Sequence, residues 1–188
     1  MESRLPDLTQ WMGQMEHNHL ARWDELPDLE LYMDQVITYL DRQLTAFKQK
    51  EEKGITSSMI NNYVKDGLVP RPKGKKYQKR HLADLLTVCT LKPVLPISDI
   101  ALLLEQVPEE QRPAFHNDLC EMLDHCFSQL SGWMGESLQE EEEEDSDHLM
   151  HLALQLSVEA ATRRVAAQRI FADLKEQKKK RKEETGKR

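Results

Sequence analysis

Four polar residues at helical spacing form the pattern in this sequence that is best suited to recognising another molecule. Ser58, Asn61, Asn62 and Lys65 stand at i, i+3, i+4 and i+7, so a helix would place them on one face. The positions between them are mostly apolar, so the opposite face would pack on a core. Asparagine amides can pair with the N6 and N7 edge of adenine, so this face suits base reading in a DNA major groove. The alternative is that the amides only decorate a solvated surface.

Six lysines and arginines follow this helix directly. Two prolines and Gly74 exclude a helix there and favour a small hairpin or loop. Such a basic loop would contact DNA backbone phosphates and fix the register of the helix without reading sequence itself. We therefore expect a wing, with Tyr77 packed beneath it. The predicted phosphate contacts are Arg71, Lys73, Lys75, Lys76, Lys79 and Arg80.

The net charge of -7 conceals an alternation of sign along the chain. Residues 1–47 sum to -6, 48–92 to +7, 93–147 to -14 and 148–188 to +6. A local basic block is the electrostatic footprint of a nucleic-acid surface, because lysine and arginine displace counterions from phosphates. A solvated basic surface is the other interpretation of the same charges.

Other chemistries find less support in the sequence. A phosphate-binding loop, a nucleophile with a histidine partner and a paired general acid and base are all lacking, so we expect no catalytic residues, no cofactor and no enzyme activity. His116 and Cys120 are spaced i and i+4, and His125 and Cys126 follow, a set that could ligate zinc. We interpret these cysteines as structural and predict no metal site.

The elements that must position these residues are predicted to be helices. Apolar periodicity, prolines and capping residues place them at about 7–23, 28–47, 57–66, 81–92, 99–105, 115–132 and 148–174. The chain has only 7 glycines, which favours helices over a turn-rich β architecture. The expected fold class is all-α, mainly α with a small β wing.

The last of these helices has a narrow seam. Its members step by threes and fours: Leu149, Leu152, Leu156, Ala160, Arg163, Ala167, Ile170 and Leu174. We predict that the Leu149 to Leu174 helix forms a homodimer; the alternative is that it folds back on its own core.

The central residues resemble a known family. The order "MINNYVKDGLVPRP", "KKY", "HLADLLTV" and "ISDIALLL" is similar to the winged helix-turn-helix of MerR-type transcription regulators, with Tyr63, Gly67, Leu68 and Pro70 at matching positions. The motif MINNYVKxGLVPxP resembles more closely that of an uncharacterised bacterial family, which is catalogued as a domain of unknown function. The resemblance implies a DNA-binding fold and no established ligand or reaction.

These observations give a predicted organisation of five parts. They are an N-terminal helical arm (1–26), a MerR-like winged helix-turn-helix domain (27–106), a helical extension (107–134), an acidic linker (135–147), and a C-terminal helix with a basic tail (148–188).

The predicted function is a sequence-specific transcriptional regulator that binds double-stranded DNA, with an unknown effector or protein partner. The alternative is a protein–protein interaction module that retains the winged-helix fold. The sequence has no signal peptide and no long apolar window, so we expect a cytoplasmic protein that does not enter a membrane.

Overall fold

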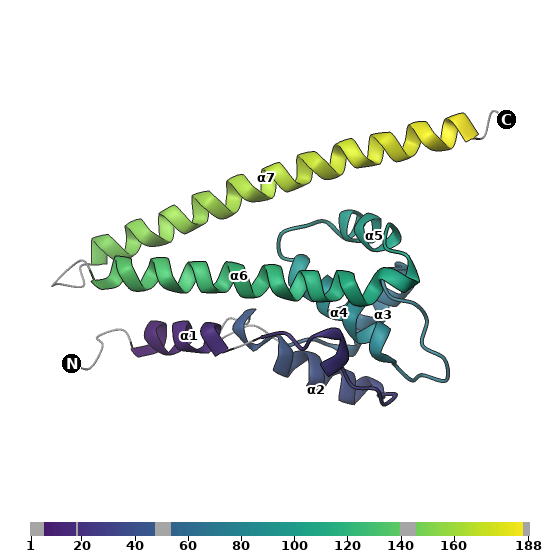
Figure 1. The fold of residues 1–188 in the computed structure, drawn as a ribbon, viewed down its shortest axis with the longest axis horizontal. Helices are drawn as coiled ribbons and strands as arrows, with labels where there is room; N and C mark the ends of the chain where they lie inside the picture. The colour runs from purple at the N-terminus through teal and green to yellow at the C-terminus, as the bar shows by residue number, and fades with distance from the viewer. Residues whose placement is uncertain (1–5, 18, 48–53, 140–145, 186–188) are drawn as a thin grey trace.

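The computed structural model describes residues 6–17, 19–47, 54–139 and 146–185. Seven α-helices follow one another through these residues (Figure 1): α1 (Pro6–His17), α2 (Met33–Gln43), α3 (Ser57–Lys65), α4 (Lys79–Leu91), α5 (Ile97–Glu105), α6 (Arg112–Gln139) and α7 (Ser146–Thr185). Short 3-10 turns cover Trp23–Glu25, Thr45–Phe47 and Glu109–Gln111. The all-α class is therefore confirmed. The described residues contain no β-strand, only two isolated bridges.

Helix α4 forms the centre of the core. Nine of its thirteen residues are buried, which is far more than an amphipathic surface helix would bury. Helices α2, α5 and α6 pack against it. The most completely buried core side chains include Val36, Leu40, Ile60, Leu82, Leu85, Leu86, Val88 and Ile100.

Helix α3 begins and ends where its sequence predicts. The Thr56 hydroxyl accepts a hydrogen bond from the Met59 N–H (3.3 Å) and caps the first turn. At the other end, Gly67 has a φ of +78°, and the Leu68 N–H donates to the Tyr63 carbonyl (3.0 Å). Ile60 and Tyr63 are buried, so they hold the inner face of this short helix on the core.

Three helix boundaries differ from the prediction in the N-terminal part. The first helix ends at His17 rather than near Trp23, and the second runs from Met33 to Gln43 rather than from near Pro27 to Phe47. The segment before Met33 remains extended because Leu31 forms an antiparallel bridge with Tyr77, with both hydrogen bonds at 2.8 Å. The extended segment before Met33 therefore lies beside Tyr77, at the end of the predicted basic loop.

The two longest helices carry the C-terminal half of the chain. Helix α6 continues through Gly132 to Gln139, and α7 begins at Ser146, so 135–139 and 146–147 of the predicted linker are helical. The acidic residues Glu140 to Asp145 lie outside the described residues. Figure 1 shows α1 and α7 on opposite sides of α6, with α7 passing over α5 toward the C-terminus.

The predicted seam of α7 lies partly against its own chain. Leu152 is buried, Leu149 and Leu156 are half-buried, and Ala167 packs with Phe171 against the main core. Near the end of the helix, Lys175 contacts Asp99 and Ser98, and Lys178 contacts Glu105. These parts of the seam therefore fold back on the chain's own helices, which was the alternative to dimerisation. The other seam residues, Ala160, Arg163, Ile170 and Leu174, are exposed. None of the described helices is long and apolar enough to cross a membrane.

Candidate functional site

The predicted recognition residues are presented together to solvent. Ser58, Asn61, Asn62 and Lys65 are all exposed on α3, opposite the buried side of the helix. The first turn of α3 contains no acidic residue, and Lys65 lies in its last turn. A face of amides, one hydroxyl and one ammonium can donate and accept hydrogen bonds and attracts negative charge.

A tight turn follows α3, in the place of the predicted wing. The Lys76 N–H donates to the Lys73 carbonyl (3.0 Å), and both central residues, Gly74 and Lys75, have positive φ values of +58° and +63°. This is the backbone conformation of a two-residue hairpin turn. Only one residue pair, Lys73 and Lys76, bridges across it, so the described residues form a tight turn here and not the predicted β wing. Tyr77 is buried beneath it, as predicted, with its ring edge-on to His81 (centroids 5.7 Å apart).

Lys75 is the one residue other than glycine that has a positive φ among the described residues. A β-carbon in this conformation costs about 1 kcal/mol, which glycine would avoid. Backbone strain of this kind is concentrated at functional positions. The lysine side chain, which is exposed at the tip of the turn, is therefore a candidate for a role in binding.

The six predicted phosphate contacts divide into two groups of three. Lys76 pairs with Glu30 (Nζ to Oε2, 3.2 Å), Lys79 pairs with Asp28 (2.5 Å), and Arg80 pairs with Glu109. Hydrogen bonds from Gln78 and Lys76 lower the pKa of Glu30, so this acid remains ionised beside the turn. The exposed side chains of Arg71, Lys73 and Lys75 have no acidic partner among the described residues.

The paired cations anchor the turn to the rest of the fold. Arg80 lies between Glu109 and the buried carboxylate of Asp84, whose Oδ2 is 3.9 Å from Nε. Asp84 also pairs with the buried Arg112 at the start of α6, which donates from Nη2 to the Leu104 carbonyl (2.9 Å). Burial raises the pKa of Asp84 to about 6, despite the opposing effect of the two guanidinium groups. These contacts connect α4, α5 and α6 below the turn.

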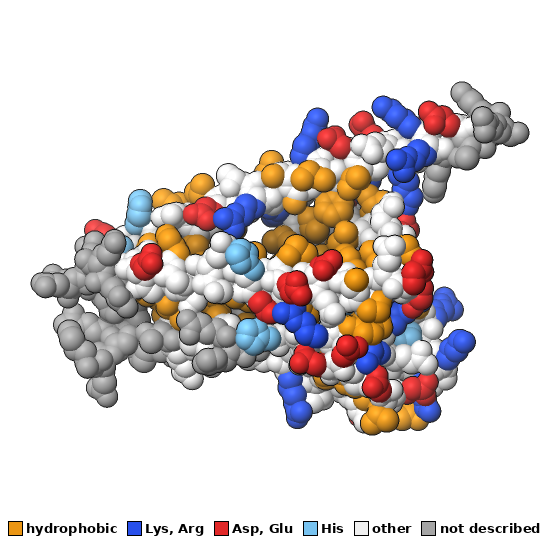
Figure 2. Space-filling view, viewed as in Figure 1, with side chains coloured by type: hydrophobic (Ala, Val, Ile, Leu, Met, Phe, Trp, Pro, Cys, Tyr) orange, Lys and Arg blue, Asp and Glu red, His pale blue; other side chains and the backbone are white. Residues whose placement is uncertain are grey.

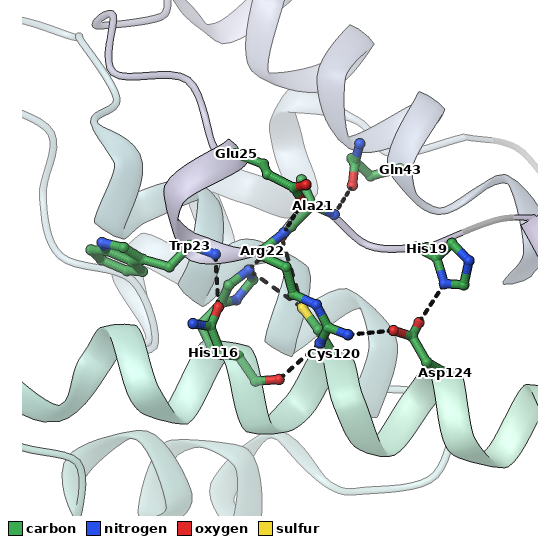
Figure 3. A network of polar contacts seen from close by, with 10 residues as sticks. His19, Ala21, Arg22, Trp23, Glu25, Gln43, His116, Cys120 and Asp124 are labelled. Atoms are coloured by element: carbon green, nitrogen blue, oxygen red, sulfur yellow. Dashed lines mark hydrogen bonds and ion pairs between the residues drawn. The ribbon is translucent and has the colours of Figure 1, made fainter.

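A second polar network joins the segment before α2 to the middle of α6 (Figure 3). Arg22 donates from Nη2 to Asp124 (2.6 Å) and from Nη1 to the Asn117 carbonyl (3.1 Å). His19 contacts the same Asp124 carboxylate (2.9 Å), and the Trp23 N–H donates to the Asn117 side chain (2.8 Å). Apolar periodicity could not predict this network, because its members are about a hundred residues apart in the sequence.

His116 and Cys120 lie at the buried side of this network. His116 Nε2 donates to the Ala21 carbonyl (2.9 Å), and the Cys120 sulfur is 3.7 Å from the same nitrogen. Burial lowers the pKa of His116 and raises the pKa of Cys120, so the pair is a neutral imidazole and a neutral thiol. An activated thiolate needs the opposite shifts. The contacts therefore fix the arm that contains Ala21 on α6.

The four residues that were considered as metal ligands do not come together. His125 and Cys126 are exposed, whereas His116 and Cys120 are buried on another side of α6. Within the described ranges, no group of three or more His, Cys, Asp or Glu side chains could hold a metal ion.

Comparison with protein families matches the central part of the chain. No curated protein and no solved structure matches the chain. A family model described as "Domain of unknown function (DUF1836)" matches residues 21–126. This range contains the arm fixed by α6, helices α2 to α5, the basic turn and the first half of α6. Because the match covers more than half of the 188 residues, the chain belongs to the DUF1836 family.

Proposed function

We propose that this protein is a sequence-specific, DNA-binding transcriptional regulator with a MerR-like winged helix-turn-helix. In this proposal α3 enters the major groove, and Ser58, Asn61, Asn62 and Lys65 contact base edges. The turn after α3 contacts backbone phosphates and sets the register. The observation that supports this proposal most directly is the arrangement of α3, whose polar face is exposed while its apolar face packs on the core.

The ion pairs refine which cations contribute to DNA affinity. Arg71, Lys73 and Lys75 can release counterions when they meet phosphates, whereas Lys76, Lys79 and Arg80 already have carboxylate partners. Each phosphate contact changes the slope of log K against log salt by about 0.9. Three contacts per chain correspond to a slope of about -2.7, whereas all six predicted contacts would give about -5.4.

The first experiment is selection of bound fragments from a randomised DNA pool at about 150 mM salt, where bare charge attraction is partly screened. An enriched motif would support the proposal. A pool that returns without enrichment would contradict sequence-specific binding by the purified protein. Capture of a partner from nuclease-treated extract would then test the interaction-module alternative.

Matched variants separate base reading from phosphate contact. Asn61→Ala with Asn62→Ala should reduce discrimination between the selected motif and a scrambled sequence by about 10-fold or more. Lys73→Ala with Lys75→Ala should weaken binding to both sequences and reduce the salt slope by about 1.8.

The control for the second pair is Lys76→Ala with Lys79→Ala, which removes the same number of charges from ion-paired positions. The salt slope of this control variant should change by less than half as much as the slope of the Lys73→Ala, Lys75→Ala variant. Equal effects of the two lysine pairs would contradict the assignment of phosphate contacts to the unpaired cations.

A further inference from the structure

A groove of about 440 Å³ lies between α5 and the last part of α7. Lys175, Lys178 and Lys179 line this lysine groove from α7, and Ser98 lines it from the first turn of α5. Figure 2 shows basic side chains gathered toward this end of α7. The lysine groove is separate from the exposed face of α3 and from the turn that follows α3.

Two of the three lysines hold α7 on α5. The Lys175 ammonium pairs with the buried carboxylate of Asp99 and donates to the Ser98 hydroxyl (3.0 Å), which itself donates to Asp99 (3.3 Å). Lys178 pairs with Glu105. An ammonium group has three N–H donors, so each of these lysines retains at least one donor for a further acceptor. The ion pairs therefore fix the lysine groove without using all of its donors.

The charges along the lysine groove are suited to one anion. Lys179 is exposed and has no acidic partner among the described residues. Three ammonium groups therefore meet the two carboxylates of Asp99 and Glu105, which leaves one positive charge in excess. A phosphodiester of a nucleic-acid backbone has one negative charge, and lysine is a common ligand of phosphate groups. A single backbone phosphate would consequently balance the charge of the lysine groove.

Contacts connect the lysine groove to α3. Lys92 follows α4 directly, and its ammonium lies 5.4 Å from the centroid of the Tyr63 ring of α3. The chain then enters α5 at Ile97, and the next residue, Ser98, lines the lysine groove. The basic turn leads into the other end of α4, which has thirteen residues and a length of about 20 Å. The turn and the lysine groove therefore lie near opposite ends of α4.

We propose that the lysine groove binds one backbone phosphate of the DNA duplex that α3 contacts. This inference rests on the proposed DNA binding, and it adds a second phosphate-binding surface to the turn. Because α4 is longer than the width of a major groove, about 12 Å, one duplex can meet both surfaces while α3 lies in the major groove between them. One phosphate here, added to the three at Arg71, Lys73 and Lys75, corresponds to a salt slope of about -3.6 per chain.

The test is the salt dependence of binding to the selected motif and to a scrambled duplex of equal length. Lys179→Ala removes the unpaired cation of the lysine groove, so it should weaken binding to both duplexes and reduce the salt slope by about 0.9. Lys180→Ala is the matched control, because this lysine is also exposed and unpaired among the described residues but lies about 100° further round the helix, toward Glu176. The control should change the slope by less than half as much. Circular dichroism establishes that both variants remain folded.

A second measurement reports proximity to DNA. An iron–EDTA group, which cleaves nearby DNA, is attached to chains with Lys179→Cys or Arg164→Cys, both carrying Cys126→Ser to remove the exposed native thiol. Arg164 is exposed on the same helix, about 22 Å before Lys179. The label at position 179 should cleave the bound duplex, whereas the label at position 164 should not.

Equal slope changes for Lys179→Ala and Lys180→Ala would overturn the phosphate site, as would equal cleavage from the two labels. If Asn61→Ala with Asn62→Ala reduces discrimination while Lys179→Ala has no effect, this inference fails and the proposed function stands. If no motif is enriched but Lys179→Ala alone reduces the slope on the scrambled duplex, sequence reading fails and the phosphate contact stands. Failure to bind any duplex at about 50 mM salt would refute both.

Discussion

Replacing Arg112 with methionine should destabilise the chain by an amount that depends on pH. The change removes a buried cation from Asp84 and a donor from the Leu104 carbonyl, while methionine fills most of the space. Arg80 remains 3.9 Å from the second Asp84 oxygen, so the cost is an upper limit. The size of this loss of stability depends on how readily Asp84 can bind a proton in place of its ion pair with Arg112.

The pKa of Asp84 is already about 6 with Arg112 in place. At pH 7 the Asp84 carboxylate can be neutralised for about 1 kcal/mol, and at pH 8 for about 3 kcal/mol, which limits the loss of stability when the ion pair is removed. At pH 5 it is mostly protonated and this contribution nearly vanishes. The lost hydrogen bond to Leu104 adds about 1 kcal/mol at every pH. The expected total is therefore about 1 kcal/mol at pH 5, about 2 at pH 7 and about 4 at pH 8.

The direction of this pH dependence follows from proton linkage. Removal of Arg112 raises the folded-state pKa of Asp84 further, so the folded variant binds a proton that the unfolded chain has lost. The variant therefore gains stability relative to wild type as the pH falls from 8 to 5.

Urea unfolding followed by circular dichroism at the three pH values measures this difference. In an Asp84→Asn background the Arg112→Met penalty should become independent of pH. A penalty that is the same at pH 5 and pH 8 in the unmodified background would refute this account of the pair.

Three other changes test local features. Gly67→Ala should cost about 1 kcal/mol in chemical unfolding, because its φ of +78° strains a β-carbon although the surrounding space is open. Lys75→Gly should instead stabilise the chain by up to about 1 kcal/mol while weakening DNA binding, and a loss of stability would contradict the strain assigned to this turn. Burial lowers the pKa of His116, so its contribution to stability falls as the pH drops below about 6.5. His116→Gln should therefore lose less stability than wild type between pH 7.5 and 5.5, measured as urea midpoints.

Much of the helical framework could be predicted from the sequence. Thr56, Gly67 and the apolar positions between them predicted the limits of α3, and the apolar positions after His81 predicted the helix α4. These features arise from interactions between residues that are close in sequence. The exposed face of α3 followed directly, because a helix with one buried side must present the other.

Contacts between residues far apart in the sequence could not be predicted from such local patterns. Gly132 suggested the end of α6, yet the helix continues to Gln139 because a glycine with open space around it is tolerated there. Pro27 suggested the start of α2, but Leu31 pairs with Tyr77 and keeps this segment extended. In α7 two sets of apolar residues had helical spacing, and only the fold determines which set faces the core.

The basic block illustrates why local charge overstates a binding surface. Its three ion-paired members meet Asp28, Glu30 and Glu109, which come from outside the block. These acids reduce the positive potential available to a phosphate, but they also fix the base of the turn on α4 and beside α2. In the proposed complex, the unpaired cations at the tip would approach DNA from an ordered support, so less conformational entropy would be lost on binding. Specificity in the proposed complex would consequently depend on the placement of α3, with a smaller share of the affinity from bulk charge.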